Sequence, residues 1–543
     1  MFGAGGGTNS YQEVEETDLI ILWGSNARET HPIFFHHVLK AVHAGARLYV
    51  VDPRRTSSAR WARTWLGVNV GTDIALANAL AHVILSEGLE HREFIERATS
   101  GFADYRASVR RYTPEYAASI CGVPADAIRS LAREYATAGR AIICWTLGIT
   151  EHHNAVDNVL ALINLALLTG HVGRYGSGLN PLRGQNNVQG GGDMGAIPDR
   201  LPGFQSVGDE NARAKFESAW GVKIPPQRGW RLNEMFEAME RGDLRALYVI
   251  GENPLVSEAD RHRAEELLSQ LDHLIVQDLS LTQTAQLASV VLPAAAGWCE
   301  SEGTVTNSER RVQRVRKIID PPGEARDDLD IVSAIAKRLG HDWGTPSAEQ
   351  LWDEVRRLSP MHAGMSYRRL EELDGLRWPC YDEDHPGELF LHARLWEDPV
   401  REPRAPFHAV EQEPPVDVIS DEYPLLLTTG RRLDSFNSGV QSGEYASPLR
   451  RGETIDLAPE DADRLSLREG EVVRVSSRRG ALNVPVHIDD QLRPGLAFMT
   501  FHFDDAPTNV LTIEANDPKS GTAEFKASAI RVDKLATLAP AGS

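Results

Sequence analysis

Short apolar runs alternate with helix-like stretches along the first half of the chain. The run DLIILW (residues 18–23) leads into Gly24 and predicts a fully buried strand, because its apolar positions are continuous rather than alternating. A helix-like stretch, PIFFHHVLKAVHAG, follows, and ARLYVV then predicts a second strand that ends at Asp52. This order is typical of a strand–helix–strand unit in a parallel sheet with both faces covered.

The same arrangement recurs later in the chain. The run RALYVI leads to Gly251, and DHLIVQ ends at Asp278. Gly24 and Asp52 are 28 positions apart, and Gly251 and Asp278 are 27 positions apart. Each glycine begins a Gly-x-Asn triplet, and a threonine, two alanines and a leucine follow each aspartate at offsets of 4, 7, 10 and 14. We infer an internal duplication that places two similar crevices at the carboxyl ends of two parallel sheets.

Each crevice has the residue types of a nucleotide site. Backbone N–H groups where a strand passes through a loop into a helix can face a phosphate. Asp52 and Asp278 can accept hydrogen bonds from a ribose or a base, and the alternative that they cap helices stays open. The first junction lacks a complete G-x-G-x-x-G, so an ordinary Rossmann site is only weakly indicated. Two half-sites of one design indicate two copies of a nucleotide-bearing ligand.

The last third of the chain has a different pattern. YPLLLTTG, EVVRVSSRRGALNVPVHI and GLAFMTFHF are short alternating runs separated by turn residues, and they predict a compact β-barrel. Proline, tryptophan and acidic residues before them predict a helical insert and an extended linker. The predicted fold class is therefore α/β, with two doubly wound parallel-sheet domains followed by a C-terminal barrel. The expected domain boundaries are 1–184, 185–340, 341–420 and 421–543.

Composition narrows the class of protein. Of the 543 residues, 42% are hydrophobic and 25% are charged, which is ordinary for a soluble globular protein. The net charge of −20 argues against binding to nucleic acid or to an anionic membrane, since both require a basic surface. The sequence offers no apolar run of about 18 residues, the length that a membrane-spanning helix needs, so we expect no direct membrane insertion. It also shows no signal-peptide pattern.

The four cysteines, Cys121, Cys144, Cys299 and Cys380, form no C-x-x-C pair. Their spacing fits no zinc or iron–sulfur pattern. We expect reduced thiols in a cytoplasmic protein.

One glycine-rich stretch, PLRGQNNVQGGGDMG, combines a single arginine with four side-chain amides. With the segments around it, it resembles the molybdopterin oxidoreductases, and within them the catalytic subunits of formate dehydrogenases. The resemblance covers nearly the whole chain. It is carried by WGSNARETHP, VVDPRRT, GTDIAL, LLTGHVGRYGSGLNPLRGQNNVQGGGDMGA, GENP, VQDLSLTQTA, EGTVTNSERRVQ, TGRRLDSFNSG and FKASAIRV.

The resemblance implies a molybdenum or tungsten ion held by two molybdopterin guanine dinucleotides, with a double-psi barrel at the C-terminus. It implies that Arg183 is the catalytic residue that binds formate, because the planar guanidinium fork meets a carboxylate bidentately. Pairing of Arg183 with a structural acid is the alternative.

Further site residues follow from the matched motifs. Those implied for one dinucleotide tail are Trp23, Gly24, Ser25, Asn26, Asp52 and Arg54. Those implied for the other are Gly251, Glu252, Asn253 and Asp278. Those implied along the pterin are Gly71, Thr72, Asp73, Leu147, Gly148 and Gln185. Those implied in the barrel are Thr429, Gly430, Arg431, Asn509 and Lys526; for Lys526 a solvated strand end is an equal alternative. His152 and His153 follow the matched channel, and we expect at most a supporting role for them.

The resemblance also implies features that this sequence lacks. They are an upstream [4Fe–4S] domain and a cysteine or selenocysteine metal ligand with a histidine beside it. We therefore expect a chain truncated before the metal ligand and inactive alone. One hypothesis is a selenocysteine encoded by UGA upstream of Met1, which in-frame genomic sequence would test.

The implied activity is two-electron oxidation of formate to CO2. The implied partners are electron-transfer subunits, of the NAD-linked flavin/iron–sulfur or the ferredoxin type. A nitrate reductase-like oxyanion reductase and a non-catalytic electron-transfer scaffold are the alternatives.

Overall fold

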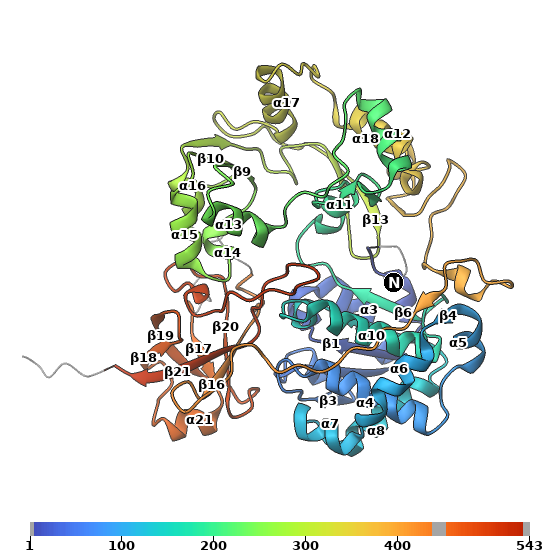
Figure 1. The fold of residues 1–543 in the computed structure, drawn as a ribbon, viewed down its shortest axis with the longest axis vertical. Coiled ribbons are helices and arrows are strands. Elements are labelled where there is room, and N and C mark those ends of the chain that lie inside the picture. Colours follow the sequence, from blue (N-terminus) through green and yellow to red (C-terminus); the bar gives the residue numbers. More distant parts are fainter. Residues whose placement is uncertain (1–4, 437–451, 536–543) are drawn as a thin grey trace, which may run out of the picture. The chain divides into compact units, whose positions relative to one another are not determined.

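The computed structural model describes residues 5–436 and 452–535, and Figure 1 traces them in sequence colours. The chain forms two compact units, and each unit is assembled from segments that are far apart in sequence. Unit 1 contains Met1–Val14, Val172–Glu252 and Leu268–Arg394, and unit 2 contains Glu15–His171, Asn253–Leu267 and Leu395–Ser543. The contiguous division at residues 184, 340 and 420 stays a prediction.

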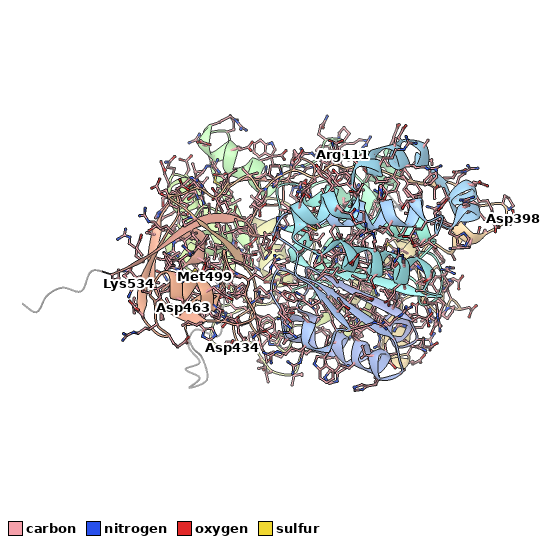
Figure 2. The ribbon with its side chains drawn as sticks, turned by 90° about the horizontal axis from the view of Figure 1, so that it is seen from below. Arg111, Asp398, Asp434, Asp463, Met499 and Lys534 are labelled. Atoms are coloured by element: carbon pink, nitrogen blue, oxygen red, sulfur yellow. The ribbon has the colours of Figure 1, made fainter. Side chains whose placement is uncertain are left out.

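A parallel sheet forms the first part of unit 2. Within unit 2 its strands are β1 (Leu19–Trp23), β2 (Arg47–Val51), β3 (Thr64–Leu66) and β5 (Ala141–Trp145), and these four follow the order β3-β2-β1-β5. Every residue of β1 and β5 is buried, as the continuous apolar runs LIILW and AIICW require of strands covered on both faces. Figure 2 shows helical ribbons above and below these strands.

The helices of this part carry the expected apolar faces. The longest are α3 (Pro32–His43), α4 (Asp73–Ser86), α8 (Ala125–Thr137) and α10 (Ala155–Thr169). Nearly every residue of α4 is buried, because α7 (Pro114–Cys121), α8 and α10 pack around it. The shorter helices are α2 (Ala27–Thr30), α5 (Arg92–Ala98), α6 (Phe102–Ser108) and α9 (Leu147–Thr150).

The barrel of unit 2 closes in the order β16-β20-β17-β19-β18-β21. Its strands are β16 (Leu425–Thr429), β17 (Ile455–Leu457), β18 (Val472–Ser476), β19 (Ala481–Ile488), β20 (Leu496–Met499) and β21 (Ser528–Lys534). Two pairs, β16 with β20 and β17 with β19, are parallel, and the other neighbours are antiparallel. This mixed pairing matches the predicted double-psi barrel. Figure 2 labels Met499 and Lys534, the last residues of β20 and β21.

A second parallel sheet lies in unit 1. Its strands are β9 (Ala246–Ile250), β10 (His273–Asp278) and β11 (Val290–Pro293), in the order β11-β10-β9. The order reproduces β3-β2-β1 strand for strand, so the duplicated sequence pattern corresponds to a duplicated sheet topology. The helix α13 (Leu232–Glu240) precedes β9, and α16 (Gln283–Leu287) lies between β10 and β11 along the chain.

The remainder of unit 1 is built around an antiparallel sheet and a tryptophan-rich core. The sheet has the order β12-β13-β14, with strands Gly303–Thr306, Arg311–Val315 and Leu376–Arg377. Trp352, Met365, Leu370, Trp378 and Cys380 are buried together beside it. Its helices are α11 (Val188–Asp193), α12 (Glu210–Trp220), α17 (Asp328–Arg338), α18 (Ala348–Leu358) and α19 (Tyr367–Glu372). Within residues 5–436 and 452–535, every helix is too short or too polar to cross a membrane.

Candidate active site

The first predicted junction is a tight loop at the carboxyl end of β1. The N–H of Gly24 donates to the carbonyl of Val51 at 2.8 Å, and Gly24 has a φ of +56°, which glycine adopts without strain. At the end of β2, the carboxylate of Asp52 accepts the N–H of Arg54 at 2.9 Å. Asp52 therefore orders the loop that follows its own strand.

The second junction repeats this geometry in unit 1. The N–H of Gly251 donates to the carbonyl of Gln277 at 2.8 Å, and its φ is +64°. The carboxylate of Asp278 accepts the N–H of Ser280 at 3.0 Å. In both copies the aspartate bonds the residue two positions on, and neither aspartate is the N-cap of the next helix, so the helix-capping alternative does not describe these side chains.

Both aspartates are buried, at 7% and 8% exposure for Asp52 and Asp278. Burial raises the pKa of Asp52 to about 6 against the opposing charge and hydrogen bond of Arg54. Burial likewise raises the pKa of Asp278. Two buried carboxylates at equivalent strand ends are costly for the free protein and are typical of sites that meet a polar ligand.

Trp23 and Asp73, two predicted cofactor residues, contact each other. The indole N–H of Trp23 donates to the carboxylate of Asp73 at 2.8 Å, and Asp73 is the first residue of α4. Thr72 is the N-cap of α4, and its hydroxyl donates to the carbonyl of Asn69 at 2.6 Å. Burial raises the pKa of Asp73. Gly71 precedes them with a φ of +73°.

The loops after β1 and β5 approach so closely that only glycine fits. The N–H of Gly148 donates to the carbonyl of Gly24 at 3.2 Å. A Cβ at position 148 would lie 2.6 Å from the oxygen of Gly24, and a Cβ at position 24 would lie 2.8 Å from the carbonyl carbon of Gly148. Leu147, beside this contact, is 37% exposed. Gly24 and Gly148, which the sequence predicted from two separate motifs, are therefore in direct backbone contact.

Lys526 is buried at 7% exposure rather than solvated. Its ammonium lies 2.7 Å from the carboxylate of Glu151 and donates to the carbonyl of Thr429 at 3.0 Å. The hydroxyl of Thr429 donates to the carbonyl of Phe525 at 2.8 Å. Two predicted barrel residues thus contact each other, and Glu151 joins them to the segment after α9.

His152 and Glu524 form a buried pair that the sequence analysis did not single out as a site. The Nδ1 of His152 lies 3.3 Å from the Glu524 carboxylate, and its Nε2 lies 3.2 Å from the carbonyl of Gly148. Both partners accept hydrogen bonds, so the geometry fits a doubly protonated imidazolium. Although burial opposes the charged forms, the pair raises the pKa of His152 and holds that of Glu524 far below its usual range.

The remaining predicted residues of unit 2 have mixed environments. The amide oxygen of Asn26 accepts the hydroxyls of Ser57 and Ser58 at 3.1 and 3.0 Å. The guanidinium of Arg54 lies 3.6 Å from the centre of the Phe498 ring. The N–H of Gly430 donates to the carbonyl of Met499 at 3.2 Å, and burial lowers the pKa of Arg431. Asn253 is the buried N-cap of α14 (Pro254–Ser257).

Arg183 lies in unit 1 and is partly buried. Its Nε–H donates to the Gln189 side chain at 2.7 Å, its Nη2 donates to the carbonyl of Gly5, and its backbone N–H donates to the Ser308 hydroxyl at 2.8 Å. Burial lowers the pKa of Arg183, and the charge of Asp193 opposes this shift. The guanidinium is therefore held in one orientation by two neighbouring groups. Among the described residues, the Gln189 amide and the Gly5 carbonyl accept hydrogen bonds from this guanidinium.

Three predicted residues of unit 1 are exposed: Gln185, Gly251 and Glu252. Their contact with a cofactor stays a prediction. Conversely, the sequence did not predict three residues that support the environment of Arg183: Asp193, Trp378 and Arg310. Arg310 is completely buried, and its guanidinium donates to the carbonyls of Gly7 and Leu389 at 2.7 and 2.8 Å and to that of Trp378. The only sequence signal for Arg310 was the double arginine in SERRVQ, and that motif does not reveal the backbone carbonyls to which Arg310 donates.

Orphaned polar atoms test whether these residues suit a polar cofactor. Among the described residues, the hydroxyls of Ser25 and Thr56 and the amide oxygen of Asn509 are buried without a hydrogen-bond partner. Buried polar atoms are normally paired, and a missing partner costs about 1–3 kcal/mol. Ser25 and Asn509 are predicted cofactor residues, and Thr56 follows Asp52 in the same loop. The donors, the acceptors and the glycine contact fit a phosphate- and base-bearing group.

Comparison with known proteins identifies the family. The chain matches Molybdopterin oxidoreductase over residues 3–338 and the molybdopterin dinucleotide binding domain over residues 425–529. The chain belongs to the molybdopterin oxidoreductase family. The predicted family, the predicted fold class and the predicted molybdopterin dinucleotide cofactor are therefore confirmed.

Individual relatives within the molybdopterin oxidoreductases are similar along almost the whole chain. The F420-dependent formate dehydrogenase subunit alpha of Methanocaldococcus jannaschii is 40% identical over 539 residues, which are 98% of this chain and 79% of the relative. Formate dehydrogenase H of Escherichia coli is 37% identical over 540 residues, which are 98% of this chain and 75% of the relative.

Among solved structures, acetylene hydratase from Pelobacter acetylenicus has a TM-score of 0.74 at 21% identity. The match covers 97% of this chain and 79% of that chain, and it shows the shared fold. Among the described residues, no group of three or more His, Cys, Asp or Glu side chains is arranged to hold a metal ion. The resemblance implies a metal held by the two pterin dinucleotides, so this finding is compatible with the match.

Proposed function

We propose that this chain is the catalytic core of a formate dehydrogenase, which converts formate to CO2, one proton and two electrons. The support is the similarity to proteins named formate dehydrogenase at 37–40% identity, together with the Arg183 environment. The observation that carries the proposal is the fixed guanidinium of Arg183. A one-carbon anion needs such a donor, because it has only its carboxylate to be recognised by.

We propose that the two duplicated junctions are the binding sites of two molybdopterin guanine dinucleotides. Asp52, with Trp23–Asn26 and Arg54, would hold one tail, and Asp278, with Gly251–Asn253, would hold the other. Thr429–Arg431, Asn509 and Lys526 would contact the tails from the barrel, and Gly71–Asp73, Leu147, Gly148 and Gln185 would lie along the pterin. The chemistry supplied by the bound molybdenum or tungsten centre is acceptance of two electrons.

The protein's own contribution is to bind and to orient the substrate. In our proposal, Arg183 binds the formate carboxylate through its planar fork and keeps the C–H bond in one direction. Gln189 and the Gly5 carbonyl prevent rotation of the guanidinium plane. Partial burial removes competing water, so each charge-assisted hydrogen bond is stronger than it would be in solvent. We further propose that the electrons leave to a partner subunit of the NAD-linked flavin or the ferredoxin type.

Formate-dependent reduction of an artificial electron acceptor by the complete, cofactor-loaded enzyme that contains this chain and its metal ligand tests the proposal. Arg183→Lys keeps the charge but loses the fork, so we expect kcat/KM for formate to fall by about 10²-fold or more. Arg228→Lys is the matched control, because Arg228 pairs with Glu234 on the surface of the same unit and should change kcat/KM less than twofold.

Three outcomes would contradict the proposal. Equal kcat/KM values for Arg183→Lys and Arg228→Lys would show that Arg183 does not bind the substrate. Turnover of nitrate in place of formate would favour the oxyanion reductase. Protein purified without metal or guanine nucleotide from a cofactor-producing host would favour a scaffold role.

A further inference from the structure

A chain of hydrogen bonds runs behind Arg183 through three side chains of unit 1. The Nε–H of Arg183 donates to the Oε1 of Gln189 at 2.7 Å. The Nε2 of Gln189 donates to the Oδ1 of Asp193 at 2.8 Å. The indole N–H of Trp378 donates to the Oδ2 of Asp193, also at 2.8 Å. Both carboxylate oxygens of Asp193 are therefore used, each by a different donor.

The direction of these bonds depends on Asp193. An ionised carboxylate can only accept hydrogen bonds, so Gln189 must turn its NH2 group toward Asp193 and its oxygen toward Arg183. A reversed amide would place an NH2 group against the Nε–H of Arg183, and two donors would then face each other. Asp193 thereby decides which end of the Gln189 amide meets the guanidinium.

Trp378, the last side chain in this series of hydrogen bonds, is also held in place by its neighbours. Trp378 is 3% exposed, and its carbonyl accepts the guanidinium of the fully buried Arg310. Arg310 also donates to the carbonyl of Gly7 at 2.7 Å. A Cβ at Gly6 would lie 2.9 Å from the Trp378 ring, so the glycine segment is packed directly against the indole. The carbonyl of Gly5, one residue earlier, accepts Arg183 and, at 3.2 Å, Gln189.

Asp193 is completely buried and acts in a charged environment. Burial raises its pKa to about 6, while the hydrogen bonds from Gln189 and Trp378 and the charges of Arg183 and Arg310 pull the pKa down. The group is consequently ionised at neutral pH, as the two donors on its oxygens require.

We propose that Asp193 is the positioning residue of the substrate-binding arginine: it fixes the Gln189 amide, which in turn fixes the plane of the Arg183 guanidinium. The inference rests on the proposed function for the identity of the substrate. The hydrogen-bond chain itself does not depend on that identity, so the two can fail separately.

Two variants test the proposal: Asp193→Asn alone, and Asp193→Asn combined with Gln189→Glu. A side-chain amide at position 193 has one acceptor and one NH2 group, so it cannot accept from Gln189 and Trp378 together. We expect Asp193→Asn to lower kcat/KM for formate by about 10-fold to 10²-fold, because the guanidinium loses its fixed plane.

The double variant Gln189→Glu with Asp193→Asn restores the polarity of the chain. The new carboxylate at position 189 accepts from Arg183 and from the NH2 group of the new amide at position 193. The oxygen of that amide accepts the indole N–H of Trp378. A carboxylate at position 189 cannot donate to the Gly5 carbonyl as the Nε2 of Gln189 does, so the double variant should recover part of the loss in kcat/KM.

A second measurement needs neither cofactor nor turnover. In 15N spectra, Trp378→Phe identifies one of the 11 indole signals, and Arg183→Lys identifies the Arg183 Nε–H signal. Asp193→Asn should shift both signals, and the double variant should return the arginine signal toward its original position. Glu354→Gln is the matched control, since Glu354 accepts the indole N–H of Trp220 at 2.8 Å on the surface of the same unit. It should move the Trp220 signal and leave the Arg183 signal and kcat/KM unchanged.

The outcomes separate the two proposals. The positioning role is refuted by an unshifted Arg183 signal in Asp193→Asn. It is equally refuted by a double variant that is no more active than Asp193→Asn, because a packing defect would only accumulate with a second change. If Arg183→Lys itself leaves formate turnover intact, the proposed function fails while the spectra still decide whether Asp193 orders the guanidinium.

Discussion

The imidazole of His152 lies 3.3 Å from the carboxylate of Glu524, and both side chains are almost completely buried. Glu524 also accepts three backbone N–H groups, those of His153, Lys526 and Ala527. The pair thus connects the segment after α9 to the loop that precedes β21. A buried carboxylate with this many donors stays ionised, and it supplies the counter-charge of His152.

Glu524→Gln should be strongly destabilising, because it leaves a buried imidazolium without its partner. We expect a loss of about 3–5 kcal/mol in the free energy of unfolding, measured by urea denaturation. The loss should be largest between pH 4.5 and 6.5, the ordinary pKa values of the two groups. The lowered pKa of Glu524 stabilises the fold fully above pH 4.5 and progressively less as the pH falls below it, and the raised pKa of His152 stabilises the fold fully below pH 6.5 and progressively less as the pH rises above it.

The control for this prediction is Glu413→Gln. Glu413 lies 3.7 Å from His153 and is largely exposed, so its removal should cost less than about 1 kcal/mol. Equal losses for the two variants would show that the buried pair has no special role.

Gly148→Ala should separate the loops after β1 and β5. The new Cβ would overlap the backbone of Gly24 at 2.6 Å, where no flexible side chain can move aside, and we expect a loss of roughly 1–3 kcal/mol in thermal or urea unfolding. Gly297→Ala is the control, because a Cβ there meets no atom within 4 Å. An unchanged stability of Gly148→Ala would refute the close contact.

Asp52 makes the stability of the cofactor-free protein depend on pH. Its folded pKa of about 6 exceeds the ordinary 3.8, so its contribution to stability is complete below pH 3.8 and is lost as the pH rises through 6. An asparagine side chain at position 52 can still accept the Arg54 N–H but is never charged. We therefore expect Asp52→Asn to be more stable than the unmodified chain by about 1–3 kcal/mol at pH 7.5, with the difference vanishing near pH 4.

Asp504→Asn, at an exposed position of the same unit, should show no such dependence. The measurement is urea unfolding across this pH range. A difference between Asp52→Asn and the unmodified chain that stays constant with pH would contradict the raised pKa.

The sheets, the barrel and the duplicated junctions were predictable because their signals are local. DLIILW and RALYVI are continuous apolar runs, and the shared offsets after Asp52 and Asp278 reflect two loops with the same hydrogen bonds. Such patterns extend over a few tens of residues, and interactions between residues close together in sequence determine the structures that they predict.

The partners of the predicted residues were not predictable, because they come from distant segments. Arg183 bonds Gly5, 178 positions away, and Trp378 bonds Asp193 across 185 positions. Lys526 appeared equally compatible with a solvated strand end, since the sequence gives no sign that Glu151 lies beside it. The interleaving of segments in the two units has the same origin: tertiary packing, not sequence order, brings them together.

The guanine nucleotide content of the purified, metal-loaded protein tests the central claim most directly. Two equivalent junctions, ending in Asp52 and Asp278, should each hold one dinucleotide tail, so acid hydrolysis should release two guanine nucleotides for each molybdenum or tungsten ion. A ratio of one would show that the repeated geometry is not a repeated site, and protein that contains metal without guanine nucleotide would contradict the account altogether.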